Sequence, residues 1–371
     1  NRPYQETSSR VSGSEIISSN SKTSYNGNYG LNASWTLYNG NKRLKTIQQE
    51  KLNNQMAELD VATSENNIQE SIAQVYIQIL YAAESVKVNE NTLQVSIAQR
   101  DRGQELLNAG SIAKSDLAQL EAQVSTDRYQ LVTAQATLED YKLQLKQLLE
   151  LDGENEMNIY LPALSDENVL APLPTKRDVY ISALSLRPEI EASKLNVEAS
   201  ELGINIAKSS YFPTISLSAG IGTNHTSGSD FTFGEQVKNG WNNSIGLSVS
   251  VPIFNNRQTK SAVQKAKLQY ETSMLSLLDE QKALYKTIES LWLDANSAQQ
   301  RYAAANEKLK STKISYELIS EQFNLGMKNT IELLTEKNNL LQAQQEQLQA
   351  KYMAILNTQL LKFYQGDQLA L

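Results

Sequence analysis

Apolar residues recur every seven positions along most of this 371-residue chain. A period of seven keeps an apolar seam facing a neighbouring helix, so it is typical of coiled coils. The rows, in chain order, are Ile72, Ile79, Val86 and Leu93; Val124, Leu131, Leu138 and Leu145; Leu277, Leu284, Leu291, Ala298, Ala305, Thr312 and Ile319; and Leu334, Leu341, Leu348 and Ile355. The pattern predicts long helices that pack side by side.

Proline placement sets the limits of these helices, because a proline ring breaks a helix interior. No proline occurs between residues 4 and 161 or between 253 and 371. Each span is interrupted once near a glycine, so each should form an antiparallel helical hairpin. An arm of about 70 residues would extend on the order of 100 Å. The predicted helices cover residues 39–108, 114–150, 256–324 and 329–364, with a further helix at 177–210.

Three shorter segments alternate with a period of two, which predicts strands with one apolar and one polar face. They cover residues 28–38, 214–222 and 244–253. Tyr, Leu, Trp, Ile and Val occupy one face, and Ser, Gly, Asn and Thr occupy the other. The segments 8–26 and 224–239 are polar and read as loops, so each strand, loop and strand should form a hairpin.

A shift of 216 residues aligns the chain with itself, which predicts a two-fold internal repeat. The shift places Ile72 on Ile288, Asn108 on Asn324 and Gly110 on Gly326. The helix and strand that precede the second copy would lie before Asn1 in the first copy. We therefore expect a further N-terminal segment of several tens of residues in the full protein.

Composition narrows the chemistry that the chain can perform. It has no Cys and one His, so it cannot build a thiol nucleophile, a disulfide, a Cys-rich zinc site or a His-based triad. We expect no enzyme activity, no cofactor and no metal site. The formal net charge of -7 provides no basic stripe for phosphates, so nucleic acid is not an expected partner. No stretch reaches the roughly 20 apolar residues of a membrane helix.

The two-faced strands suit a lipid-embedded, water-filled barrel. Every backbone group of a sheet in lipid must be paired, so the sheet must close. Four strands are too few to close a barrel, and small barrels begin near eight strands. Copies of the chain should therefore share one barrel, with Trp35 and Trp241 as interfacial anchors. The alternative is a soluble coiled-coil scaffold or adaptor protein with a small β module.

Three motifs are similar to those of the TolC-like outer-membrane efflux protein family (outer membrane factors). Arg187-Pro188-Glu189-Ile190, with Pro213-Thr214-Ile215-Ser216-Leu217 after it, resembles the signature before the family's third strand. Val251-Pro252-Ile253-Phe254-Asn255 resembles the segment where a strand leads into a long helix. At both helix tips a glycine precedes an acid by six residues, as in the family. The resemblance covers essentially the whole chain.

The resemblance implies an α+β membrane protein that forms a homotrimer in the outer membrane of a Gram-negative bacterium and extends into the periplasm. Each chain would give four strands, residues 1–38 and 212–254, to a twelve-stranded transmembrane β-barrel. Residues 39–150, 177–211 and 255–364 would form a periplasmic tunnel of antiparallel coiled coils, and residues 151–176 and 365–371 an equatorial region. Such a channel conducts substrates from a periplasmic adaptor (a membrane fusion protein) and an inner-membrane transporter to the exterior.

The two helix tips are the predicted docking points for the adaptor. Glycine adopts the left-handed backbone conformation that ends a helix, so a plain helical turn explains part of each sequence. Ile112 and Met327 add apolar side chains where exposure is expected, which suggests a covering partner. The predicted docking residues are Gly110, Ser111, Ile112, Gly326 and Met327.

The family closes its tunnel just above the tips, and the resemblance places this periplasmic gate at five positions. Ser115 and Asp116 would face Phe323 and Lys328 of the second hairpin, and Glu332 would form an acidic ring. The family commonly has Tyr in place of Phe323 and Arg in place of Lys328, which suggests a weaker latch. The alternative is that these charges are solvated surface groups. The sequence identifies neither the cargo nor the adaptor and pump.

Overall fold

A computed structural model describes residues 7–12, 15–20, 25–151, 159–160, 169–227 and 231–369. The described chain is mostly helical, with a small amount of sheet. It divides into two compact units. One unit comprises residues 1–53 and 197–273, and the other comprises residues 54–196 and 274–371.

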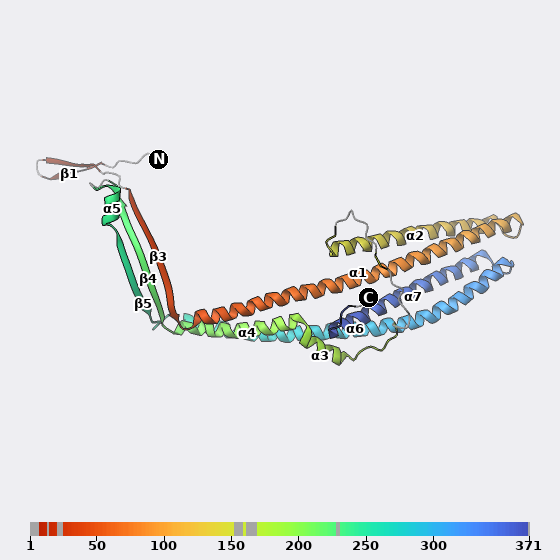
Figure 1. The fold of residues 1–371 in the computed structure, drawn as a ribbon. Coiled ribbons are helices and arrows are strands. Elements are labelled where there is room, and N and C mark those ends of the chain that lie inside the picture. The colour runs from red at the N-terminus through yellow and green to blue at the C-terminus, as the bar shows by residue number, and fades with distance from the viewer. Residues whose placement is uncertain are drawn as a thin grey trace. The chain divides into compact units, whose positions relative to one another are not determined.

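The first unit contains a three-stranded antiparallel sheet in the order β3 (Asn26–Asn39), β4 (Thr214–Thr226) and β5 (Asn242–Ser250) (Figure 1). Trp35 lies opposite Leu217, which in turn lies opposite Leu247. Residues directly opposite each other share a face, and successive residues alternate between faces. The alternation predicted from the sequence is therefore observed across all three strands as far as Trp35 and Thr36. A register shift between Thr36 and Tyr38 interrupts it, so Tyr38, and not the predicted Leu37, lies opposite Ile215. The apolar face carries Tyr29, Leu31, Ala33, Trp35, Ile215, Leu217, Ala219, Ile221, Ile245, Leu247 and Val249.

The opposite face is polar and is tied together by hydroxyl groups. Ser218 Oγ donates a hydrogen bond to the carbonyl of Gly246 at 3.2 Å, and Ser248 Oγ donates to the carbonyl of Ser216 at 3.4 Å. Nothing in the described residues covers the middle of the apolar face, where the Ile245 side chain is 84% exposed. Within the described chain, β3 and β5 each pair along one edge only. The sheet thus has a polar face, an uncovered apolar face and two edges without a paired strand in the described chain.

Both segments predicted as polar loops contain regular structure. In the first, β1 (Thr7–Ser12) and β2 (Glu15–Asn20) form an antiparallel hairpin, so the loop prediction for 8–26 is wrong. In the second, β4 continues to Thr226 and a short helix, α5 (Phe233–Asn239), follows. Thr232 caps α5 by accepting a hydrogen bond from the Glu235 backbone N–H, and the Glu235 carboxylate accepts one from the Thr232 N–H. A capping box of this kind marks the start of a helix in the sequence. The segment was predicted as a loop from its polar composition alone.

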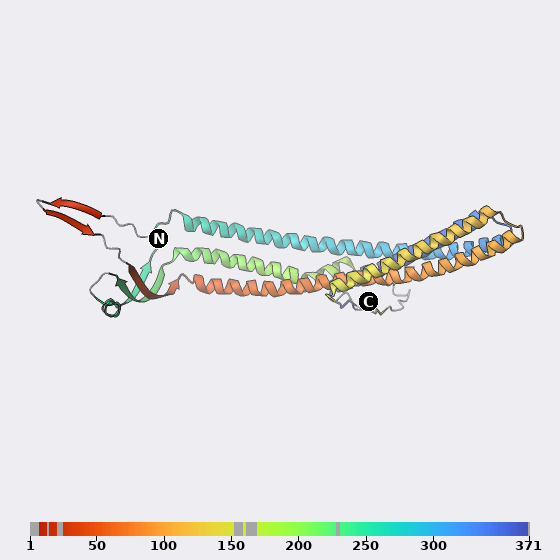
Figure 2. The same cartoon turned by 90° about the horizontal axis from the view of Figure 1, so that it is seen from above.

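The long helices form two helical hairpins, most of which belong to the second unit. One joins α1 (Lys42–Asn108) to α2 (Lys114–Leu148), and the other joins α6 (Gln258–Asn324) to α7 (Thr330–Gln365). The two helices of each hairpin lie side by side (Figures 1 and 2). In the second hairpin, Lys308 pairs with Glu346 at 2.7 Å and Ser315 bonds Glu336 at 3.1 Å. Later α6 residues meet earlier α7 residues, so the predicted antiparallel arrangement is observed.

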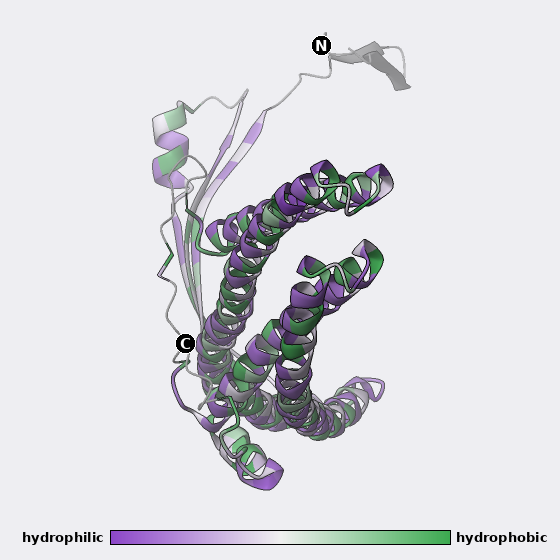
Figure 3. Ribbon diagram, turned by 90° about the vertical axis from the view of Figure 1, so that its right-hand side faces the viewer, coloured by the Kyte–Doolittle hydropathy of each residue, from purple (hydrophilic) through white to green (hydrophobic). Residues whose placement is uncertain are grey.

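The predicted apolar rows lie inside these helix pairs. Every member of the four rows is buried or partly buried, and polar residues alternate with them along each helix (Figure 3). Ile79 and Leu341 are buried, as is Leu120 beside Gly103. A Cβ at Gly103 would lie 2.4 Å from Leu120 Cδ1, so the absence of a side chain lets α1 and α2 approach closely. The period of seven therefore identified the packed seam.

The single helix predicted at 177–210 is in fact two helices, α3 (Lys176–Leu186) and α4 (Pro188–Lys208). Arg187 between them is extended, with φ -75° and ψ 123°. Proline disfavours a helical conformation at the residue before it and cannot donate a backbone hydrogen bond. Pro188 therefore ends α3 and begins α4, and the prediction overlooked this break.

The two long helices agree with the offset seen in the sequence. Both α1 and α6 contain 67 residues, and their first residues, Lys42 and Gln258, are 216 positions apart. The tip glycines Gly110 and Gly326 share a positive φ, at 76° and 73°. The predicted equatorial region, residues 151–176 and 365–371, lies partly outside the described residues, at 152–158, 161–168 and 370–371. No helix in the described residues is long and apolar enough to cross a membrane.

Candidate functional site at the hairpin tips

Both hairpins turn through the same backbone motif. In the first, Gly110 N–H bonds the Leu107 carbonyl at 2.9 Å and Ser111 N–H bonds the Leu106 carbonyl at 2.8 Å. The second hairpin repeats these bonds from Gly326 and Met327 to Phe323 and Gln322, at 2.9 and 2.8 Å. This is the Schellman ending, in which a left-handed glycine lets the last carbonyls find donors.

The predicted docking residues differ in exposure. Met327 is 70% exposed and its neighbour Leu325, which the sequence analysis did not select, is 75% exposed. Ile112 is only half-buried, because it folds back toward Gly103 in the first hairpin. A Cβ at Gly110 or Gly326 would meet nothing within 4 Å. The second tip therefore presents more apolar surface than the first.

The start of α7 brings three side chains together. Glu332 accepts hydrogen bonds from Lys328 Nζ at 2.6 Å and from the Asn329 backbone N–H at 3.2 Å, and Asn329 Oδ1 accepts from the Glu332 N–H at 2.9 Å. The bond from Lys328, followed by that from Asn329, lowers the pKa of the Glu332 carboxyl below its ordinary value. Glu332 is thus held ionised at the first turn of a helix, where a negative charge is favourable.

The start of α2 is simpler. Asp116 accepts a hydrogen bond from the Ala113 backbone N–H at 3.0 Å, and Ser115 is exposed. No contact between Asp116 and Lys328 is found among the described residues of this single chain. Phe323 is buried within its own chain. Of the five predicted gate residues, the chain by itself brings together only Lys328 and Glu332.

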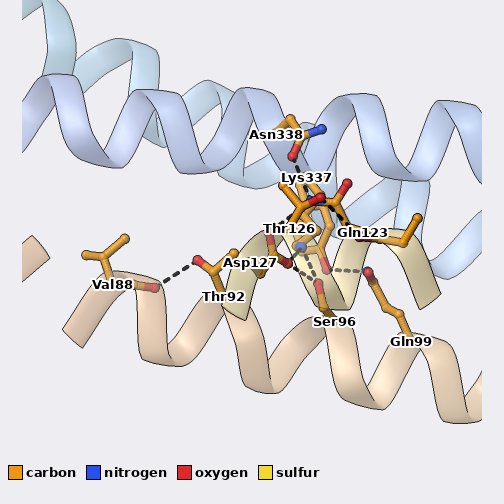
Figure 4. A network of polar contacts seen from close by, with 11 residues as sticks. Val88, Thr92, Ser96, Gln99, Gln123, Thr126, Asp127, Lys337 and Asn338 are labelled. Atoms are coloured by element: carbon orange, nitrogen blue, oxygen red, sulfur yellow. Dashed lines mark hydrogen bonds and ion pairs between the residues drawn. The ribbon is translucent and has the colours of Figure 1, made fainter. Parts of the chain in front are cut away.

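A buried polar cluster lies farther along the hairpins (Figure 4). Lys337 of α7 donates hydrogen bonds to Ser96 of α1 and to Asp127 of α2, and Ser96 donates to Asp127. Gln123 Nε2 donates to the second carboxylate oxygen of Asp127 at 2.8 Å. Lys337 is 3% exposed and Asp127 is 1% exposed. The cluster ties the first hairpin to the second within one chain.

Burial lowers the pKa of Lys337, and the hydrogen bond and charge of Asp127 oppose that shift. Lys337 and Asp127 therefore depend on each other, because a buried charge without its partner destabilises the fold. This cluster was not predicted from the sequence, although its signal is present there. Each member follows an apolar row residue by three positions, Ser96 after Leu93, Asp127 after Val124 and Lys337 after Leu334, which is seam spacing.

Comparison with known proteins decides the family. The model of the family described as outer membrane efflux protein matches residues 4–150 and 179–366, which is most of the chain. The chain belongs to the outer membrane efflux protein family. This is a family of transport channels of the Gram-negative outer membrane and periplasm, so membership also gives the location of the chain.

Individual relatives have low sequence identity to this chain, but the matches cover most of it. Outer membrane efflux protein BepC of Brucella suis is 24% identical over 79% of this chain and 61% of its own length. Outer membrane protein TolC of Escherichia coli is 24% identical over 77% of this chain and 58% of its own length. The chain thus spans about three fifths of these curated relatives. A crystal structure of CusC has the same fold, with a TM-score of 0.78, 19% identity, and coverage of 98% of this chain and 82% of that one.

The segment around Arg187, which resembles a family signature in the sequence, has a visible structural role in this chain. The buried Arg187 guanidinium bonds Glu189 at 2.8 Å and Glu70 of α1 at 3.1 Å. It also lies 4.1 Å from the centre of the Tyr364 ring of α7, within cation–π range. Arg187 thus connects α1 and α7 to the α3–α4 break that Pro188 creates. The motif was recognised in the sequence, but these partners were not predicted.

Replacing one member of the buried pair should destabilise the helical hairpins strongly. Lys337→Met leaves Asp127 buried without its cation, at an expected cost of about 3–5 kcal/mol. The double variant Asp127→Leu/Lys337→Met removes both charges and should recover most of that loss. Denaturant unfolding followed by helical circular dichroism measures both effects.

Lys308→Met is the matched control, because the Lys308–Glu346 pair is largely exposed. Its loss should cost under about 1 kcal/mol. A Lys337→Met midpoint equal to that of the control, or a double variant as unstable as Lys337→Met, would contradict the proposed dependence of the pair.

Proposed function

We propose that the protein is the outer-membrane channel of a tripartite efflux or secretion system. The sheet of the first unit carries this proposal, because one face is uncovered and apolar while the other is lined by Ser, Gly and Asn. Lipid outside and water inside satisfy both faces at once. β3 has 14 residues, which exceeds the roughly 9–11 residues that a tilted strand needs to cross a bilayer.

The open edges of the sheet support a shared barrel. An unpaired edge cannot lie in hydrocarbon, because its N–H and C=O groups would lack partners. β3 and β5 should therefore continue into further strands, and neighbouring copies of the chain can supply them. We propose a homotrimer with a twelve-stranded barrel, to which each chain contributes four strands from residues 1–38 and 212–254.

The long helices extend the conduit into the periplasm. Residues 39–150, 177–211 and 255–364 form the tunnel wall in this proposal, and residues 151–176 and 365–371 form the equatorial region. The equal lengths of α1 and α6 and their constant offset support a two-fold internal repeat. Two similar hairpins per chain would give six around a trimer, which is a suitable wall for a central duct.

The tips are the proposed docking site for a periplasmic adaptor served by an inner-membrane transporter. Gly110, Ser111, Ile112, Gly326 and Met327 form the predicted contact, and we add Leu325 because it is exposed beside Met327. Large apolar side chains in full exposure at a turn are expected where a partner covers them. Conduction itself requires no catalytic residue.

The proposed gate lies within about two turns of the tips. Ser115, Asp116, Phe323, Lys328 and Glu332 belong to it, and contacts between chains of the trimer would complete what one chain lacks. Phe323 is buried and has no hydrogen-bonding group, so it supports the hairpin by packing. Glu332 would place three carboxylates around the axis, and such a ring favours cations. The alternative of a soluble coiled-coil scaffold or adaptor is not favoured, because the chain belongs to a family of membrane channels.

Two neighbouring substitutions on opposite faces of β4 test the membrane barrel. Ala219→Lys puts a cation on the lipid face opposite Ile245, in the middle of the apolar face. It should cost about 2–4 kcal/mol near the midplane, so little trimer should reach the outer membrane. Ser218→Lys faces the water-filled interior and should assemble normally. Outer-membrane fractionation followed by mass measurement of the detergent-solubilised protein checks the outcome.

The wild-type protein should require detergent and have the mass of three chains. Wild-type protein that remains in buffer as a monomer would contradict the proposal. Equal assembly of the Ala219→Lys and Ser218→Lys variants would also contradict it, because the two faces would then be equivalent.

The Glu332 ring should make the channel cation-selective, and Lys328 should set the pH at which this selectivity is lost. The pKa of Glu332 is lowered by Lys328, so its charge persists above that lowered pKa and disappears as the pH falls through it. Lys328→Ala should move the loss of selectivity to a higher pH, toward the ordinary glutamate range near 4.3. Reversal potentials in planar bilayers measure this.

Glu332→Gln should have weak cation selectivity with little pH dependence in the same range. Lys362→Ala is the control for the loss of a lysine of α7 far from the gate. Two outcomes would contradict the placement of Glu332 in the pore. One is that Lys328→Ala loses its cation selectivity at the same pH as the wild-type channel, and the other is that Glu332→Gln keeps full selectivity.

A further inference from the structure

The helix α5, which the sequence analysis read as loop, is attached to one particular side of the sheet (Figure 1). Thr223 Oγ1 of β4 donates a hydrogen bond to the Val237 carbonyl of α5 at 2.9 Å. The Phe233 ring meets the edge of His225 at 5.0 Å and that of Tyr29 at 6.3 Å, between ring centres. Three residues of the sheet therefore contact α5 directly.

These three residues lie on the apolar side of the sheet. Tyr29 is directly opposite Thr223, and His225 follows Thr223 by two positions, so all three share a face. The same alternation leads back along β4 to Ile221 and Leu217 on that face. The helix thus covers the outside of the proposed barrel wall, and it does not lie over the Ser, Gly and Asn face that would line the pore.

The helix also begins where the apolar band ends. On this face of β4 the sequence of side chains is Leu217, Ala219 and Ile221, and then it becomes polar at Thr223 and His225. α5 covers these last two positions. It lies at the end of the strands away from α1, α4 and α6, which in the proposed orientation is the outer-leaflet side of the membrane.

Aromatic side chains surround this point. Phe231, Phe233, Trp241, Tyr25 and Tyr29 are all exposed. Aromatic residues gather at membrane interfaces, where a ring contacts acyl chains and a polar tip stays hydrated. Lys238 and Glu235 give the helix charged groups for the hydrated side. This composition fits the boundary between acyl chains and headgroups.

The helix is held firmly enough to present this surface. The Gln236 side-chain amide accepts a hydrogen bond from the Thr226 N–H at 2.9 Å and donates to the Phe231 carbonyl at 2.8 Å. The capping box at Thr232 fixes its first turn. A seven-residue helix is too short to persist alone, so its contacts with β4 determine its position.

We propose that α5 is an interfacial anchor that binds the outer-leaflet lipid surface from outside the barrel wall. This inference rests on the proposed membrane channel. It extends that proposal, because a channel alone does not specify whether the β4–β5 connection closes the pore or contacts lipid. Phe231, Phe233 and Trp241 contact the acyl-chain boundary, and the pore mouth stays open beside them.

Site-directed spin labelling tests this directly, because the chain has no natural cysteine. Gly234→Cys places a nitroxide on α5 where a Cβ would meet nothing within 4 Å, so folding should be preserved. Two reference labels are Ile245→Cys on the apolar face and Ser218→Cys on the polar face. The trimeric channel is reconstituted in phospholipid vesicles, and collisions with oxygen and with a water-soluble nickel chelate are measured.

The anchor predicts lower oxygen accessibility for the label at residue 234 than for the label at residue 245, and lower nickel access at residue 234 than at residue 218. Nickel access at 234 equal to that at 218 would place α5 in water and overturn the anchor. Protection from both reagents would show contact with protein and would overturn it too. Failure of the channel itself is distinguishable, because the Ile245 label would then lack the oxygen signal of lipid.

A second measurement separates an anchor from a lid. Phe231→Ser/Phe233→Ser removes the apolar contacts of α5 but leaves β4 and β5 intact. An anchor predicts unchanged single-channel conductance and a lower yield of trimer in the outer membrane. Higher conductance with a normal yield would show that α5 obstructs the pore and would overturn the proposal.

Discussion

The pairing of backbone groups is the constraint on which the rest of the structure depends. A sheet with a bare apolar face belongs in lipid, but lipid offers no partner to an unpaired N–H or C=O group. The described sheet satisfies its central strand β4 and leaves one edge of β3 and one edge of β5 open. In the proposed channel, closure into a barrel with other copies meets this requirement, and the proposed oligomer, pore and role of the helices follow from it.

The helical hairpins meet a different requirement, because water surrounds them in the proposed channel. Their apolar residues need a partner helix, and the rows spaced by seven supply one along each arm. Within this seam, the Ser96–Asp127–Lys337 cluster is a charged exception that fixes which hairpin faces meet, since the three groups satisfy one another only in one register. Arg187 performs a similar task at the other end of the second unit, where it binds two carboxylates and stacks on Tyr364.

Sequence periodicity predicted the large elements well, because each long helix and strand repeats its signal many times. The predicted tip glycines, Gly110 and Gly326, end their helices as expected, and the observed start of α2 at Lys114 matches the prediction. Features set by two neighbouring or nearby residues were missed: the capping box of Thr232 and Glu235 that starts α5, and the break at Arg187–Pro188. The partners of Lys337 were also missed, because they come from two other helices and no local pattern specifies them.

The location of the Trp35 ring tests the central claim most directly. In a channel that keeps only this tryptophan, through Trp241→Phe and Trp292→Phe, phospholipids brominated on their acyl chains should strongly quench its fluorescence. The matched control moves the ring by one residue to the polar face, as Ser34→Trp with Trp35→Phe, and should be quenched weakly. Equal quenching of the two rings, or stronger quenching of the control, would contradict the account of a sheet with lipid on one side and water on the other.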